Sequence, residues 1–191
     1  MSKKMDVRWH GRAGQGAVTA AKTLAELISQ EEGVYAQGFA VYGAEKRGAP
    51  VIAFTRVSDK VIRDHSEYME PDIVLLLDPT LLGLVDVKEG LKKDGKVIVN
   101  TAFDKESVIK ELGLEGYDVY VVDANKISME AMGRAIPNTP MIGALAKVTG
   151  LFSKDDVVNG VIELLKEAGK FPQKVIDGNK KAIEMAYEEV K

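Results

Sequence analysis

Two spacings of apolar residues alternate along the first two thirds of the chain. Short runs rich in Val, Ile and Leu, bounded by Gly, Pro, Asn or Asp, are typical of β-strands. The run 72–77 is continuously apolar between Pro71 and Pro79, as expected for a central strand buried on both faces. The expected strands are 6–10, 34–39, 51–57, 72–77, 96–100 and 117–122.

Helical spacing of apolar residues separates several of these runs and dominates the last third. The expected helices are 17–28, 104–112, 141–149, 157–168 and about 174–190. Gly150 closes the third of these, Ser153 and Asp156 open the fourth in the manner of a capping box, and Pro172 precedes the last.

Alternating strands and helices predict an α/β fold of the Rossmann-like kind. We expect a mostly parallel sheet with helices on both faces, right-handed crossovers and a helical C-terminal arm. With 191 residues and no long linker, the chain is expected to form a single domain over 1–191. Its core would cover about 1–136 and the helical arm about 137–191.

Composition removes several classes of site. The sequence holds no cysteine, so it offers no disulfide, no thiolate zinc site, no cysteine nucleophile and no cysteine-ligated iron–sulfur cluster. Its two histidines, His10 and His65, have no metal-ligand spacing around them. We therefore expect no metal site in this chain.

Charge and hydropathy bear on partners and location. The net charge of −3 does not suit nonspecific binding of nucleic acid, which needs a basic surface. No apolar stretch reaches the roughly 20 residues that span a bilayer, and no apolar signal-peptide core follows the N-terminus. These observations predict a cytoplasmic protein that binds neither nucleic acid nor membrane.

A glycine-rich turn follows the first expected strand and opens the first expected helix. The turn comprises Gly11, Arg12, Ala13, Gly14, Gln15 and Gly16. Amide groups at the start of a helix have no intrahelical partner and lie at the positive end of the helix dipole. Glycines allow an anion to approach such amides closely, so a phosphate or carboxylate is the natural ligand.

Two familiar nucleotide sites do not match this turn, the first by its glycine spacing and the second by its residues. A dinucleotide fingerprint reads GxGxxG, whereas this turn reads GxxGxG, and no acidic residue ends the second strand to bind a ribose. A phosphate loop of the GxxxxGK type would need Lys and Ser or Thr where Ala17 and Val18 stand. A purely structural turn remains an alternative, while Arg12 and Lys22 favour anion binding because both add positive charge near the helix start.

A second polar loop lies between the second and third expected strands. Residues Tyr42, Gly43, Glu45, Arg47 and Gly48 form a rich set for a plain connection, and we expect the loop to face a partner subunit or a ligand near the glycine turn. The alternative is a set of ordinary surface charges. Asp78 and Asp123 each follow a strand, where a turn or cap role is favoured over contact with a ligand.

Four segments together resemble a known family. They are VRWHGRAGQGAVTAAKTLAE at 7–26, YGAEKRGAPV at 42–51, PDIVLLLDPT at 71–80 and NTPMIGAL at 138–145. In this order and spacing they resemble the gamma subunit of pyruvate and related 2-oxoacid:ferredoxin oxidoreductases. The resemblance covers nearly the whole chain.

The resemblance implies that this chain is one subunit of an enzyme and is not active on its own. Such enzymes decarboxylate pyruvate oxidatively with coenzyme A, giving acetyl-CoA and CO₂, and reduce ferredoxin. Thiamine diphosphate, Mg²⁺ and iron–sulfur clusters would lie on alpha, beta and delta-type partner subunits, and no cofactor would bind to this chain alone. The gamma-type domain would help to hold coenzyme A, whose phosphates suit the turn of Gly11–Gly16 with Arg12 and Lys22.

Two alternatives to this function stay open at this point. The oxoacid could be 2-ketoisovalerate, 2-oxoglutarate or indolepyruvate in place of pyruvate. The chain could also be a stand-alone Rossmann-like nucleotide-binding module or a pure interaction module.

Overall fold

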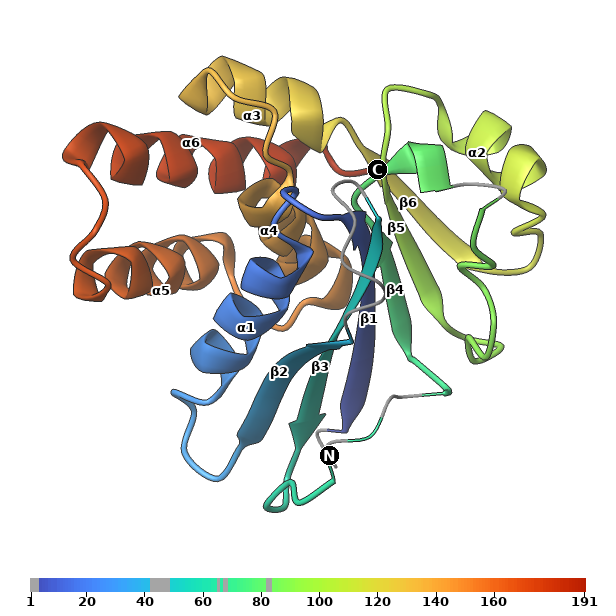
Figure 1. The fold of residues 1–191 in the computed structure, drawn as a ribbon, viewed down its shortest axis with the longest axis horizontal. Coiled ribbons are helices and arrows are strands. Elements are labelled where there is room, and N and C mark those ends of the chain that lie inside the picture. The colour runs from blue at the N-terminus through green and yellow to red at the C-terminus, as the bar shows by residue number, and fades with distance from the viewer. Residues whose placement is uncertain (1–3, 42–48, 65, 67–68, 82–83) are drawn as a thin grey trace.

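The computed structural model describes residues 4–41, 49–64, 66, 69–81 and 84–191. Among them are six strands, six α-helices and one short 3-10 helix, η1 (Figure 1). In chain order they are β1 (Met5–Arg12), α1 (Ala17–Ile28), β2 (Tyr35–Val41), β3 (Pro50–Ser58), β4 (Ile73–Leu76), η1 (Pro79–Leu81), β5 (Lys96–Asn100), α2 (Lys105–Leu112), β6 (Asp118–Val122), α3 (Ala124–Met132), α4 (Asn138–Thr149), α5 (Lys154–Glu167) and α6 (Gln173–Glu189).

The strands form one mixed sheet in the order β2-β3-β1-β4-β5-β6. Strands β1, β4, β5 and β6 pair in parallel, as predicted, whereas β3 is antiparallel to both β1 and β2. The expected mostly parallel sheet is thus a mixed one, with its antiparallel pairs at the side that carries β2 and β3. The connection between Val41 and Pro50 is too short for a parallel crossover, which needs a dozen or more residues, so β2 and β3 can only be antiparallel neighbours.

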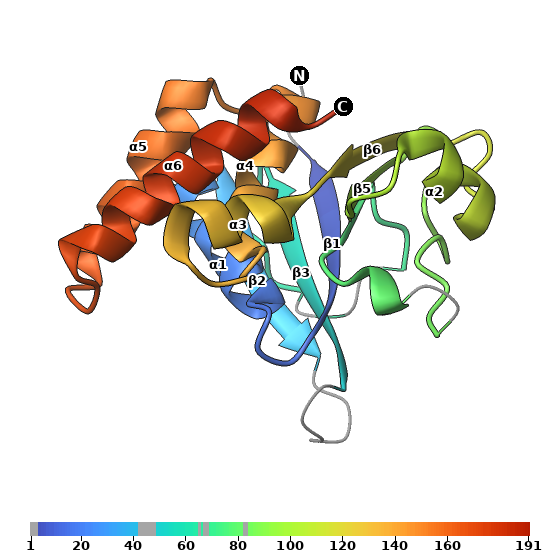
Figure 2. The same cartoon turned by 90° about the horizontal axis from the view of Figure 1, so that it is seen from above.

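Helices cover both faces of the sheet, but unequally. Figure 2 shows α1, α3, α4, α5 and α6 gathered on one side of the sheet and α2 on the other. Two separate apolar cores result. The larger core holds Trp9, Leu24 and Leu145 among others, and the smaller one holds Val74, Leu76 and Val99 under α2. Strand β4 supplies residues to both cores, which agrees with the central, doubly buried position expected from its sequence.

The expected helical arm is a layer that packs directly on the rest of the fold. Residues Thr139 to Ala146 of α4 are buried, and several of them belong to the same core as α1 and β1. Helix α6 lies against α4 so closely that a Cβ on Gly143 would stand 2.6 Å from the carbonyl oxygen of Ile183. Helix α3 was not expected from the sequence, and it begins at Asp123, whose carboxylate accepts a hydrogen bond from the Lys126 N–H.

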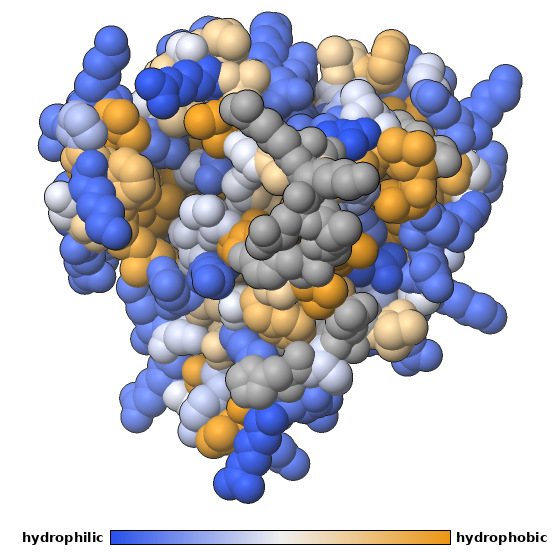
Figure 3. Space-filling view, in the orientation of Figure 1, coloured by the Kyte–Doolittle hydropathy of each residue, from blue (hydrophilic) through white to orange (hydrophobic). Residues whose placement is uncertain are grey.

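On the face shown in Figure 3, hydrophilic side chains surround the perimeter, and apolar side chains show between them in separate patches. Two of the most exposed apolar side chains, Leu84 and Phe103, follow β4 and β5 at the carboxyl end of the parallel strands. Within the described residues, no helix combines the length and the apolar character needed to cross a membrane.

The crossing of α4 and α6 provides a test of the packing. We expect Gly143→Ala to lower the free energy of unfolding by about 2 kcal/mol, because the new methyl group meets backbone that cannot rotate away. Gly160→Ala in α5 is the matched control, since its methyl group would meet only the tip of the Leu27 side chain, which can change rotamer. Urea denaturation of both variants measures the difference, and equal stabilities would contradict the proposed close contact.

Candidate functional site

The candidate site lies where the chain leaves the two central strands β1 and β4. After β1 the chain enters α1 on the face of the larger core, and after β4 it enters η1, whose Leu81 belongs to the smaller core. The carboxyl ends of two neighbouring parallel strands thus send the chain to opposite faces. In open α/β sheets such a switch point forms a crevice, and ligands bind there.

Two glycines shape the turn that opens α1. Gly14 and Gly16 have φ values of 97° and 81°, which L-residues with a side chain rarely adopt. Gly16 is the N-cap of α1, and no side chain caps this helix start. A Cβ at Gly16 would also stand 2.8 Å from Nδ2 of Asn138, the first residue of α4. The start of α4 therefore packs against the start of α1, and only glycine fits between them.

Three amides of the turn are used within the protein. The Arg12 N–H donates to Oε1 of Gln15 at 2.7 Å, the Ala13 N–H donates to the Ala49 carbonyl at 3.3 Å, and the Gln15 N–H donates to the Arg12 carbonyl at 3.1 Å. These bonds hold the turn closed and tie it to the segment that precedes β3.

Further amides at the same place have no partner among the residues that the structure describes. Among them are those of Gly14, Gly16, Ala17 and Val18. Ala17 and Val18 lie in the first helical turn, where no intrahelical acceptor exists. Together they form the positive end of the α1 dipole, which favours an anion. The turn thus has the amide groups that the sequence predicted, at Gly14–Val18 rather than over the whole of Gly11–Gly16.

The carboxylate of Asp78 joins this turn to the one that follows β4. Its Oδ2 accepts a hydrogen bond from Nε2 of Gln15 at 2.7 Å and lies 3.2 Å from Nε of Arg12, while its Oδ1 accepts from the Thr80 N–H at 2.8 Å. Burial alone would raise the pKa of Asp78, but the hydrogen bonds from Thr80 and Gln15 and the charge of Arg12 outweigh it. Its pKa consequently lies below the ordinary value, and the group is an anion at neutral pH.

The Arg12 side chain lies over the start of η1. Its Nε donates to Oγ1 of Thr80 at 3.1 Å and an Nη donates to the Thr80 carbonyl at 3.4 Å. Its side chain is 26% exposed, compared with 9% for Asp78. The guanidinium therefore remains accessible beside the glycine turn, although the adjacent carboxylate offsets part of its charge.

Lys22 is not brought together with the turn. It is the sixth residue of α1, about 7.5 Å along the helix axis from the first. Its exposed side chain borders a shallow hollow together with Glu26 and Gly38, and no residue of the glycine turn lines that hollow. Its part in ligand binding stays a prediction, and it could act only at longer range than Arg12.

The loop that contains Tyr42, Gly43, Glu45, Arg47 and Gly48 lies outside the described residues. Its two flanks are placed, because Pro50 pairs with Arg12 across the sheet and the Ala49 carbonyl accepts from the turn. The chain thus enters and leaves this loop at the edge that carries the glycine turn, as expected. A contact of the loop with a partner or ligand stays a prediction.

The structure adds residues that the sequence did not place in the site. Thr80 and Asn138 border the turn, and Asn100 joins the ends of β4 and β5 by donating to the Leu77 carbonyl at 2.7 Å. A polar residue at the end of a buried apolar strand was the available signal for Asn100. The turn role favoured for Asp78 is confirmed by its bond to Thr80, but its bonds to Gln15 and Arg12 could not be read from the sequence.

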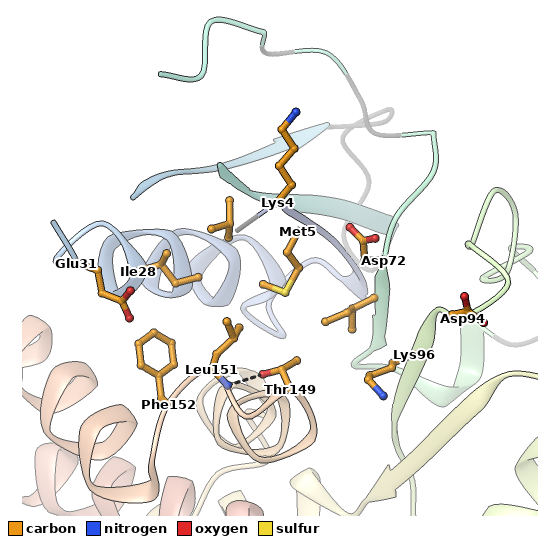
Figure 4. Close-up of a pocket in the computed structure, with 12 residues that line it drawn as sticks. Lys4, Met5, Ile28, Glu31, Asp72, Asp94, Lys96, Thr149, Leu151 and Phe152 are labelled. Atoms are coloured by element: carbon orange, nitrogen blue, oxygen red, sulfur yellow. Dashed lines mark hydrogen bonds between the residues drawn. The ribbon is translucent and has the colours of Figure 1, made fainter. Parts of the chain in front are cut away.

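A different hollow of about 360 Å³ lies at the other end of the central strands, where β1 and β4 begin (Figure 4). Its lining includes three carboxylates, those of Glu31, Asp72 and Asp94, but only two ammonium groups, those of Lys4 and Lys96. Lys96 is already paired with Asp118 at 2.6 Å. The hollow therefore does not suit an anion. Its apolar lining consists of Met5, Ile28, Val57, Ile73, Leu151 and Phe152.

No group of three or more His, Asp or Glu side chains that could hold a metal ion occurs within the part of the chain that the structure describes. With no cysteine in the sequence, the described residues offer hydrogen bonds and charge but no ligand set for a metal or a cluster.

His10 lies buried on β1 beneath the switch point. It is 3% exposed, and its Nε2 has no hydrogen-bond partner among the described residues. Burial, and secondarily the charge of Arg8, lowers the pKa of His10 from 6.5 to about 4. Arg8 itself donates to the carbonyls of Val87 and Glu89 at 3.0 and 2.7 Å, which fixes the segment between η1 and β5.

The lowered pKa of His10 predicts a pH-dependent stability. Between pH 6.5 and 4 the unfolded chain binds a proton at His10 that the folded protein does not, so the free energy of unfolding decreases as the pH falls through this window. We expect a loss of roughly 3 kcal/mol relative to His10→Phe, which cannot titrate. Denaturation of both proteins from pH 7 to 4 gives this difference, and parallel curves would contradict the assignment.

Comparison with known proteins gives a consistent result along the whole chain. Residues 6–189 match the family model described as pyruvate ferredoxin/flavodoxin oxidoreductase. Pyruvate synthase subunit PorC of Thermotoga maritima is 47% identical over 189 residues, which cover 99% of this chain and 96% of that protein. The pyruvate/ketoisovalerate oxidoreductases common subunit gamma of Pyrococcus furiosus is 46% identical over 184 residues, 96% of each chain.

Solved structures agree with the fold. The crystal structure of pyruvate oxidoreductase subunit PORC from T. maritima has a TM-score of 0.83 at 44% identity and covers 99% of this chain and 98% of that one. A 2-oxoglutarate:ferredoxin oxidoreductase from Magnetococcus marinus, solved with 2-oxoglutarate, coenzyme A and succinyl-CoA bound, has a TM-score of 0.74 at 18% identity. The match covers 98% of this chain but 31% of that longer one, and at this identity it shows the shared fold alone.

Proposed function

This chain belongs to the pyruvate ferredoxin/flavodoxin oxidoreductase family, as a gamma subunit of the PorC type, and on this premise we propose that it contributes the coenzyme A-binding domain of a multi-subunit pyruvate:ferredoxin oxidoreductase. The complex would convert pyruvate and coenzyme A to acetyl-CoA and CO₂ and transfer the electrons to ferredoxin. Alpha, beta and delta-type subunits would carry thiamine diphosphate, Mg²⁺ and the iron–sulfur clusters. The absence of cysteine from this chain supports that division.

The observation that carries the coenzyme A proposal is the set of unpartnered amides at Gly14, Gly16, Ala17 and Val18, next to the accessible guanidinium of Arg12. Coenzyme A has a 3′-phosphate and a pyrophosphate, and both are anions of the kind that a helix start binds. Gln15 would position the turn, and Gly11 would allow its close packing on Ala17 and Leu77. Lys22 would add a longer-range attraction.

The edge around the turn also suits contact with a partner subunit. Leu84 and Phe103 are each 66% exposed at the carboxyl ends of β4 and β5, where large apolar side chains have no cover in the described structure. Exposed apolar side chains beside a polar site are typical of protein interfaces. We assign the same edge to Tyr42, Gly43, Glu45, Arg47 and Gly48, which would face the partner or the ligand.

The proposed site would bind coenzyme A, the cosubstrate that the reactions of all these 2-oxoacids share. Phosphates of coenzyme A are the same for every oxoacid, so this chain would not select between pyruvate and 2-ketoisovalerate. The subunits that hold thiamine diphosphate would make that selection. A gamma subunit of this design could accordingly serve two enzymes, as the name of the P. furiosus relative, common subunit gamma, says of that protein.

The first test concerns the charge at the mouth of the site. In the assembled enzyme we expect Arg12→Gln to raise the KM for coenzyme A about tenfold, because a charge-assisted bond to phosphate is lost. Lys22→Ala should raise it only about twofold, since water screens a more distant charge. Lys174→Ala on the exposed start of α6 is the control. Initial rates at varied coenzyme A measure these effects, and an unchanged KM for Lys22→Ala would remove Lys22 from the site.

The second test concerns assembly. A tagged form of this chain, purified anaerobically from its native host, should retain larger chains that carry thiamine diphosphate and iron, and only this assembly should reduce ferredoxin with pyruvate. The isolated chain should contain no iron, because it has no cysteine to hold a cluster. Recovery of the chain without any partner, or an assembly that oxidises no 2-oxoacid, would contradict the proposed function.

A further inference from the structure

The carboxylate of Asp78 accepts hydrogen bonds from both turns at the switch point. Nε2 of Gln15 donates to it from the glycine turn, and the Thr80 N–H donates to it from the turn after β4, while Nε of Arg12 forms an ion pair with it at 3.2 Å. These nitrogen groups can only donate, and an ionised carboxylate can only accept. Asp78 is buried, with its side chain 9% exposed, so water cannot easily replace these bonds.

Asp78 thereby determines which way the Gln15 carboxamide points. With Nε2 bound to Asp78, the other end of the amide, Oε1, faces the Arg12 N–H and accepts from it at 2.7 Å. That bond closes the turn from inside. A donor at position 78 would oppose the Nε2 group of Gln15 and favour an amide turned the other way, which would then present an NH₂ group to the Arg12 N–H.

We propose that Asp78 is a positioning residue for the anion site, which through the orientation of Gln15 holds the amides of Gly14–Val18 and the Arg12 side chain in their binding arrangement. The inference rests on the proposed function, since it concerns binding of coenzyme A phosphates at that turn. It assigns to an acidic residue a supporting role in a site for anions, because the polarity of its hydrogen bonds outweighs the unfavourable sign of its charge.

Charge and hydrogen-bond polarity make opposite predictions for Asp78→Asn. If charge dominated, removal of the carboxylate would strengthen anion binding. If polarity dominates, the introduced amide has one oxygen and cannot accept from Gln15 and Thr80 at two separate atoms as the carboxylate does. The Gln15 side chain then loses its orientation, and anion binding weakens. The sign of the change in KM for coenzyme A therefore separates the two.

A pair of exchanged side chains tests the mechanism directly. In Asp78→Asn, the NH₂ group of the new asparagine faces the NH₂ group of Gln15. In Gln15→Glu, the new carboxylate faces the carboxylate of Asp78. The double variant D78N/Q15E restores one donor and one acceptor with the same total charge as the wild type. Its amide at position 78 donates to the carboxylate at position 15, which still accepts from the Arg12 N–H. Rescue by the double variant would identify hydrogen-bond polarity as the cause.

The experiment uses the assembled oxidoreductase with wild-type or variant gamma subunit. We expect each single variant to raise the KM for coenzyme A about tenfold and the double variant to return it to within about threefold of wild type. The kcat and the KM for pyruvate should change less than about twofold in all three. Asp123→Asn is the matched control, an aspartate that follows β6 and caps α3, where asparagine caps equally well and no change is expected.

Several outcomes would overturn the inference. A lower KM in Asp78→Asn would show that charge dominates, and a double variant no better than the single ones would show that the effect is not one of polarity. If Arg12→Gln raises the KM for coenzyme A while Asp78→Asn, Gln15→Glu and the double variant leave it unchanged, the role of Asp78 fails and the proposed function stands. If Arg12→Gln and these three variants all leave the KM unchanged, the proposed coenzyme A site itself fails.

Discussion

The parallel pairing of β1 with β4 is the constraint on which the rest of the structure depends. Each strand contributes to the packing of helices on the sheet, and the chain leaves the two strands toward opposite faces. This divergence separates the glycine turn from η1. The buried carboxylate of Asp78 joins the two segments, because it accepts hydrogen bonds from Gln15 and from the Thr80 N–H and pairs with Arg12. The arrangement of the site therefore follows from the topology of the sheet and from this one shared acceptor.

The site combines weak positive charge with well-placed amides. Asp78 offsets part of the charge of Arg12, and Lys22 is directed elsewhere, so a strong basic patch is absent from this part of the described structure. The anion binding that we propose would depend on partial charges at a helix start, which act only over the first turn. Such a site would favour a phosphate that fits its geometry over anions in general. That property would suit coenzyme A, the ligand proposed above.

The two faces of the sheet differ in how their polar groups are treated. On the side of the larger core, Trp9 donates to Thr55, and Thr55 donates to the Ala21 carbonyl, so the buried polar atoms are paired. On the opposite face, β1 places Arg8 and His10 in the interior, and each has a nitrogen without a partner among the described residues. Buried polar groups of this kind are costly, and they make the region beneath the switch point sensitive to pH.

Local sequence determined most elements of this protein but not their pairing. Periodicity gave 17–28 and 96–100 with the bounds that the structure shows, because an amphipathic helix and a doubly buried run each carry their signal within a few residues. It missed α3, a helix of nine residues that follows β6 after the single residue Asp123, and it could not show that β3 runs antiparallel. The glycine turn was visible for the same reason as the helices, since its φ requirements are local. The bonds of Asp78 to Gln15 and Arg12, the placement of Asn138 over Gly16 and the separation of Lys22 from the turn were decided only by the tertiary structure. Those contacts join residues more than 60 positions apart or depend on which side of a helix meets the sheet, and no local pattern encodes either.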